Sequence, residues 1–182
     1  MTSTVKRLGR SAVVALAAWC VTGCGYALAG RGNALPSSIK RIGVPTFTNQ
    51  SHTPDLEQII TEAVRQELRS RGRYVVVPDA TGVDAVLSGV VTALRTDVAS
   101  FTEARQASRY LVTLAASVEF REQPANTVFW SNPSFRLSEE YDVPSGSGAT
   151  DPTQLFQADR QALERLARTF ARSLITSILE AM

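Results

Sequence analysis

The side chains best suited to proton transfer or metal binding are few in this sequence. His52 is its single histidine, and it lies in a polar stretch before a predicted helix, without the glycine-flanked serine of a hydrolase. The carboxylates are scattered, except for Glu139, Glu140 and Asp142, which could form a weak cation patch but fit a solvated strand end better. No glycine-rich phosphate-binding loop follows a predicted strand. We therefore predict a protein that is not an enzyme, with no catalytic residues, no metal site and no cofactor.

A second group of residues could bind an anion. Four arginines lie on or between predicted strands, namely Arg95, Arg105, Arg109 and Arg136. Guanidinium groups at adjoining strand ends can hold a phosphate through paired hydrogen bonds. Asp97 and Glu103 lie among these arginines, so a mixed-charge surface that serves solubility is the main alternative.

The residue with the most specific chemistry is Cys24. The first ten residues hold three basic residues and no acid, and the apolar run of residues 11–20 follows them. This is the pattern of a secretory signal peptide, and the run is too short to span a bilayer. Directly after it, Val21-Thr22-Gly23-Cys24 resembles the bacterial lipobox, in which the cysteine thiol receives a diacylglycerol. We predict cleavage before Cys24 and lipidation of its sulfur.

Cleavage changes what the composition implies. It removes three of nineteen basic residues and none of seventeen acidic ones, so the mature chain has sixteen basic and seventeen acidic residues. The excess of basic residues therefore belongs to the signal peptide and gives no support for nucleic-acid binding. Cleavage also removes Cys20, and acylation of Cys24 leaves no thiol for a disulfide. We expect three segments: a signal peptide over residues 1–23, a lipidated tether over 24–38 and one domain over 39–182. Gly25, in place of an aspartate that would favour inner-membrane retention, favours the outer membrane.

Hydrophobic periodicity places the secondary structure. Strands are predicted at residues 39–45, 74–77, 85–94, 109–121, 127–130 and 134–141, and helices at residues 53–72 and 151–182. The clearest alternation runs from Tyr110 to Phe120, where every second residue is apolar, so one face of this strand should be buried and the other wet. Thr53 and Asp151, each followed by a proline, are the expected helix N-caps. Pro133 indicates a bulge or an edge position.

The order of these elements predicts the fold class. Several strands able to pair antiparallel lie between two amphipathic helices, which is typical of an α+β protein. We expect a two-layer sandwich, with two helices packed on one face of a mostly antiparallel sheet of four to five strands. The last helix is longer than such a domain requires; it is interpreted as a core helix, with a protruding end that grips a partner as the alternative.

Several motifs in this order resemble one known family, the LPS-assembly lipoproteins LptE. The residues that carry the resemblance are Cys24-Gly25-Tyr26, Leu35-Pro36-Ser37-Ser38-Ile39-Lys40-Arg41-Ile42-Gly43-Val44-Pro45-Thr46-Phe47-Thr48-Asn49, Leu56-Glu57, Arg71-Gly72-Arg73-Tyr74-Val75-Val76 and Ala85-Val86-Leu87-Ser88-Gly89. The predicted strand that carries Arg109-Tyr110 fits the same order. The resemblance therefore extends over nearly the whole mature chain and is most specific in its first half.

The resemblance implies a non-enzymatic lipoprotein on the periplasmic side of the cell outer membrane. Its partners would be the outer-membrane β-barrel LptD, which it plugs and helps to assemble, and lipopolysaccharide on its way to the outer leaflet. Arg95, Arg105, Arg109 and Arg136 are then candidate lipopolysaccharide contacts, chosen by charge alone. The alternative is an envelope lipoprotein that activates a cell-wall synthase or forms part of a secretion complex.

Overall fold

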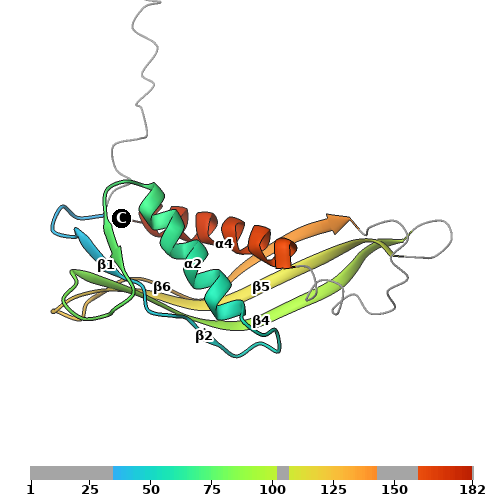
Figure 1. The fold of residues 1–182 in the computed structure, drawn as a ribbon, viewed down its shortest axis with the longest axis horizontal. Helices are drawn as coiled ribbons and strands as arrows, with labels where there is room; N and C mark the ends of the chain where they lie inside the picture. Colours follow the sequence, from blue (N-terminus) through green and yellow to red (C-terminus); the bar gives the residue numbers. More distant parts are fainter. Residues whose placement is uncertain (1–34, 102–106, 143–159, 182) are drawn as a thin grey trace, which may run out of the picture. The chain divides into compact units, whose positions relative to one another are not determined.

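The fold is an α+β domain in which two helices lie on one side of a single twisted sheet (Figure 1). The computed structural model describes residues 35–101, 107–142 and 160–181, and residues 33–182 belong to one compact unit. The elements in chain order are β1 (Arg41–Gly43), β2 (Thr48–Asn49), α2 (Leu56–Ser70), β3 (Val75–Val77), β4 (Ala85–Phe101), β5 (Ala107–Glu122), β6 (Val128–Asp142) and α4 (Arg160–Glu180). The predicted α+β class with two helices is confirmed.

The sheet is mixed and has six strands in the described part of the chain, so the predicted count of four to five was low. The order is β3-β1-β4-β5-β6, with β2 also paired to β4. The long strands β4, β5 and β6 pair antiparallel, whereas β1 pairs in parallel with β3 and β4, and β2 with β4. The parallel pairs arise because α2 carries the chain back to the end of the sheet where β1 began.

Strands β1 and β2 behave as two pieces of one strand beside β4. Ile42 lies opposite Ala85 and Thr48 opposite Val90, so both short pieces follow the same neighbour. Between them the chain leaves the sheet, and the backbone N–H of Phe47 donates to Thr61 Oγ1 on α2 over 2.9 Å. The Phe47 ring fills the space above Gly89, where an added Cβ would lie 2.3 Å from the ring. Gly89 is therefore required by the close approach of an aromatic ring.

The alternation predicted for β5 is confirmed. Its apolar positions face the helices and are at most 8% exposed, namely Tyr110, Val112, Leu114, Ala116, Val118 and Phe120. Strand β4 keeps the same two faces only because a bulge between Val91 and Ala93 shifts its register by one residue. Leu87 and Val91 before the bulge, and Leu94 after it, all lie opposite buried residues of β5. Strand β4 continues to Phe101, well past the predicted end at residue 94.

Helix α2 buries the predicted face but begins later than predicted. The buried residues are Leu56, Ile60, Thr61, Ala63, Val64 and Leu68. The N-cap is Asp55 at φ 60°, not Thr53. Thr53 is 2% exposed, and its carbonyl accepts a hydrogen bond from Asn49 Nδ2 over 2.8 Å. Because this loop holds Thr53 inside the fold, the chain turns at Asp55, a residue type that tolerates left-handed backbone. At the other end, Gly72 at φ 66° follows the helix as predicted.

Helix α4 packs along α2 and over the sheet. Its predicted apolar stripe is buried at Leu163, Leu166, Phe170, Leu174 and Ile178, and the predicted cap at Asp151 lies outside the described residues. Phe170 is fully buried, with its ring edge-on to Phe135 of β6 at a centroid distance of 5.3 Å. Phe135 in turn lies edge-on to Trp130 at 6.3 Å. No described helix combines the length and apolarity needed to cross a membrane.

The ladder between β5 and β6 is interrupted where the sequence indicated. The register with β5 shifts between Ala116 and Val118, which lie opposite Phe135 and Asn132, so Pro133 lies in the irregular stretch. Strand β6 is also an edge strand of the sheet. Both interpretations of Pro133 are therefore confirmed, and the two predicted segments form one bent strand.

A carboxylate ties the starts of β1 and β4 together. Asp84 Oδ2 accepts hydrogen bonds from the backbone N–H groups of Lys40 and Arg41, each over 2.8 Å. The hydrogen bond from Arg41 and then that from Lys40 lower the pKa of Asp84 below its ordinary value. The backbone of Asp84 adds bonds to Arg41 O and from Gln123 N. This one residue therefore links β1, β4 and the end of β5.

Candidate functional site

The candidate site is the face of the sheet that the helices leave uncovered, which we call the open face (Figure 1). Partners across an antiparallel pair lie on the same face, and residues alternate between faces along a strand. Because Val112 and Leu114 point to the helices, Thr113 and its partners point the other way. The charged and hydroxyl side chains of the open face include Arg95, Asp97, Arg109, Thr113, Arg136, Ser138, Glu140 and Asp142.

Arg95 on β4 and Arg136 on β6 lie on the open face with one strand, β5, between them. Arg95 lies opposite Thr113 on β5, and Arg136 lies opposite Ala115, two residues further along β5. Strand spacing and rise place their Cα atoms roughly 12 Å apart. Both side chains are exposed, and neither forms an ion pair with another described residue; Arg136 Nε donates to Ser134 Oγ over 3.2 Å. Two guanidinium groups are thus available to one extended anionic ligand.

Arg109 shares this face but is occupied by acids. Its Nη1 lies 2.9 Å from Glu140 Oε2, and its Nε lies 3.2 Å from Asp142 Oδ1. The hydrogen bond to Asp142 and then the one to Glu140 raise the pKa of Arg109 above its ordinary value. The sheet therefore brings Arg109 close to two carboxylates, which compensate its positive charge. Arg105 and Cys24 lie outside the described residues.

The other candidate residues are either exposed to solvent or hydrogen-bonded to neighbouring side chains. His52 is exposed in the loop before α2. The acids suggested as a weak cation patch act separately, because Glu140 and Asp142 bind Arg109 while Glu139 accepts a hydrogen bond from Tyr141 Oη over 3.1 Å. Among the described residues, no three His, Cys, Asp or Glu side chains are grouped so that they could hold a metal ion.

The open face is balanced in charge and rich in hydroxyl groups. Thr113 Oγ1 and Ser138 Oγ are 2.9 Å apart across β5 and β6. Further along the same face, Arg121 Nη2 lies 2.6 Å from Glu119 Oε1, and the hydrogen bond to Glu119 raises the pKa of Arg121. A flat surface of this kind is suited to a wet, polar environment or a polar partner, since its groups are already partly satisfied by one another.

Comparison with known families decides the identity. The sequence model of the LptE family, described as lipopolysaccharide-assembly, matches residues 39–178. The chain belongs to the LptE family. The match begins just before β1 and ends two residues before the end of α4, so it spans nearly all of the described fold of this LptE-family protein. The resemblance stated from the motifs is confirmed. No curated protein matches the sequence at a significant level.

Several solved structures are similar to this chain at low sequence identity. Protein XCC0632 from Xanthomonas campestris has a TM-score of 0.51 and 14% identity, covering 81% of this chain and 90% of that one. Rare lipoprotein B from Shewanella oneidensis has a TM-score of 0.46 and 14% identity, covering 76% of this chain and 96% of that one. The PelC dodecamer from Paraburkholderia phytofirmans has a TM-score of 0.47 and 16% identity, covering 79% of this chain and 91% of that one. At such identities, the first similarity establishes a common fold alone.

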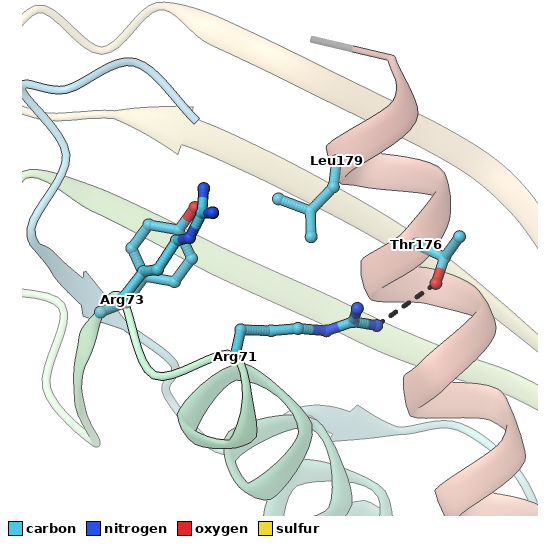
Figure 2. Close-up of a pocket in the computed structure, with 5 residues that line it drawn as sticks. Arg71, Arg73, Thr176 and Leu179 are labelled. Atoms are coloured by element: carbon cyan, nitrogen blue, oxygen red, sulfur yellow. Dashed lines mark hydrogen bonds between the residues drawn. The ribbon is translucent and has the colours of Figure 1, made fainter. Parts of the chain in front are cut away.

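The structure of this LptE-family chain also contains a basic cavity that sequence reasoning missed. It has a volume of about 250 Å³ and is lined by Arg71, Arg73, Tyr74, Thr176 and Leu179 (Figure 2). The sequence signal was limited to two arginines around a helix-terminating glycine. Nothing in the sequence indicated that the end of α4 would complete the cavity.

Proposed function

We propose that this LptE-family chain is an outer-membrane lipoprotein that plugs the lumen of the LptD β-barrel and helps it to assemble and to pass lipopolysaccharide to the outer leaflet. The family match over residues 39–178 carries the proposal. Its physical support is the open face, where charges are balanced and hydroxyl groups are frequent. The interior of a large membrane barrel is polar and wet, so the charged groups of such a face can stay hydrated there.

The attachment to the membrane is part of the same proposal. Residues 1–23 act as a cleaved signal peptide, Cys24 carries the lipid, and residues 24–38 connect it to the domain of residues 39–182. Acyl chains anchor a protein by burial of their carbon atoms, so no membrane-spanning helix is needed. The absence of an aspartate after Cys24 supports delivery to the outer membrane on its periplasmic side.

Purification of the tagged full chain in mild detergent tests the barrel partner. We expect a large β-barrel protein to co-elute at close to equal stoichiometry. The double variant Thr113→Glu/Ser138→Glu places two like charges at the centre of the open face and should lose the barrel. Arg168→Glu, on the exposed side of α4, is the matched control and should retain it.

Two outcomes would contradict this proposal. If the wild-type protein purified without a co-eluting barrel protein, the proposed plug role would be wrong. Co-elution of a cell-wall synthase, or of further copies of this chain without a barrel, would instead support the activator or secretion-complex alternative.

We further propose that Arg95 and Arg136 contact the anionic groups of lipopolysaccharide. Because exposed charge-assisted contacts contribute on the order of 1 kcal/mol each, the double variant Arg95→Gln/Arg136→Gln should weaken lipopolysaccharide binding roughly thirtyfold. Surface plasmon resonance on immobilised lipopolysaccharide measures this. Arg109→Gln is the control of equal chemistry on the same face, and we expect it to have a smaller effect because its charge is compensated by Glu140 and Asp142. Equal losses for both variants would refute the assignment to Arg95 and Arg136.

A further inference from the structure

The basic cavity lies where α2 ends and the chain turns into β3. Arg71 caps the helix, Gly72 makes the turn at φ 66°, and Arg73 precedes the strand. Figure 2 shows the side chains of Arg71 and Arg73 extending towards the last turns of α4, where Thr176 and Leu179 lie. The cavity is therefore basic on the α2 side and mainly apolar at Leu179.

The two guanidinium groups are not equivalent. Arg71 Nη2 lies 2.7 Å from Glu67 Oε1 and donates to Thr176 Oγ1 over 3.4 Å, which fixes its position between the two helices. Arg73 is exposed and forms no ion pair with another described residue. One arginine is thus held in place while the other keeps its full charge for a ligand. A guanidinium group can donate two parallel hydrogen bonds to the oxygens of one phosphate. A phosphate group is therefore the ligand that suits this cavity best.

Other positive charge lies at the same end of the sheet. Arg41 pairs with Val75 in the parallel register of β1 and β3, so Lys40 and Arg41 begin their strand beside the turn that holds Arg73. The nearby carboxylate of Asp84 is already engaged by the backbone N–H groups of these two residues. Lys40 and Arg41 therefore add positive charge near Arg73, and its reach into the solvent is set by the salt concentration.

The same cavity marks the start of the described chain. Leu35 is 6% exposed, and its N–H donates to Tyr74 Oη, one of the cavity residues, over 3.3 Å. Leu35 follows Cys24 by 35 − 24 = 11 residues. A chain of that length spans at most about 40 Å, even when fully extended. A lipid on Cys24 would therefore keep this end of the domain within that distance of the membrane.

We propose that the cavity binds the phosphate headgroup of an anionic phospholipid in the membrane that holds the anchor. This inference rests on the proposed lipidation of Cys24. The phosphate contacts Arg73 and Arg71, and Leu179 contacts the first carbon atoms of the lipid. The contact orients the domain with the ends of α2 and α4 towards the bilayer surface and its open face free for a partner.

Short-chain lipids test the cavity directly. The full chain, purified in mild detergent, is titrated with dihexanoyl phosphatidylglycerol, and the Nε–H signals of Arg71 and Arg73 are followed by NMR. We expect both signals to shift, and the double variant Arg71→Gln/Arg73→Gln to bind about tenfold more weakly. The charge-matched control is Arg69→Gln/Arg168→Gln, which removes two exposed arginines from the same helices outside the cavity, and it should bind within about twofold of wild type. Thermal unfolding followed by circular dichroism establishes that each variant is folded.

Three results would overturn the inference. If dihexanoyl phosphatidylcholine gave the same shifts, they would reflect non-specific association with lipid and detergent, not recognition of a negatively charged lipid. Inorganic phosphate competing at equal concentration would indicate a free-anion site. An equal loss of affinity in the control variant would show that binding depends only on the overall charge of the protein. The titration requires neither the barrel nor the acyl chain, so its failure is distinguishable from failure of the proposed function.

Discussion

Replacing Cys24 by serine is expected to move the protein from the membrane fraction to the soluble periplasmic fraction. A serine hydroxyl does not receive the diacylglycerol that a lipobox thiol receives, so the chain loses its anchor. Each buried CH₂ group of an acyl chain contributes about 0.8 kcal/mol to membrane binding, which makes the loss of whole acyl chains a change of many orders of magnitude in partitioning. Fractionation after removal of peripheral proteins with salt, and intact-mass spectrometry of the product, measure the effect.

The chain supplies its own control in Cys20, four residues upstream. Cys20→Ser makes the same chemical change inside the signal segment and should leave both fractionation and mass unchanged. A wild-type protein whose mass shows no acyl group would contradict the anchor, and with it the proposed location of the domain.

Truncation of Phe170 to alanine should produce the largest loss of stability. Its side chain is fully buried between α4 and the sheet and meets Phe135 edge-on. Removing a buried aromatic ring costs about 3–5 kcal/mol, against a total stability of roughly 5–15 kcal/mol for a domain. Equilibrium denaturation followed through Trp130, which contacts Phe135, measures the shift in midpoint.

Two further substitutions serve as controls for this prediction. Phe170→Leu keeps most of the volume and should lose less stability than Phe170→Ala. Thr169→Ala, the adjacent helix position outside the core, should change the free energy of unfolding by no more than about 0.5 kcal/mol. A Phe170→Ala protein with an unchanged midpoint would mean that α4 does not depend on the aromatic contacts with β6.

Local patterns predicted the parts of the fold that local physics determines. The alternation of β5 and the apolar stripes of both helices follow from burial of one face, and the structure confirms them. The two-residue strand β2 was missed because two residues carry no periodic signal. The parallel pairing of β1 with β3 was missed because it depends on the return path of α2. The continuation of β4 to Phe101 depends on a bulge at residues 91–93 that no local pattern indicated.

The candidate site was less predictable because it depends on register between distant strands. Arg109 meets Asp142 and Glu140 only because the irregular stretch at Pro133 sets how β6 aligns with β5. Charge alone therefore could not separate Arg109 from Arg95 and Arg136. The cavity at Arg71 and Arg73 likewise required knowing that the last turns of α4 lie beside the end of α2.

The proline on β6 also has a consequence for the protein before it meets a partner. A long outer strand offers unpaired backbone groups that can recruit another polypeptide into a growing fibre. Pro133 has no N–H to offer, and the bend around it interrupts the flat repeat that stacking requires. The chain is thereby hindered from polymerising through this edge of the sheet.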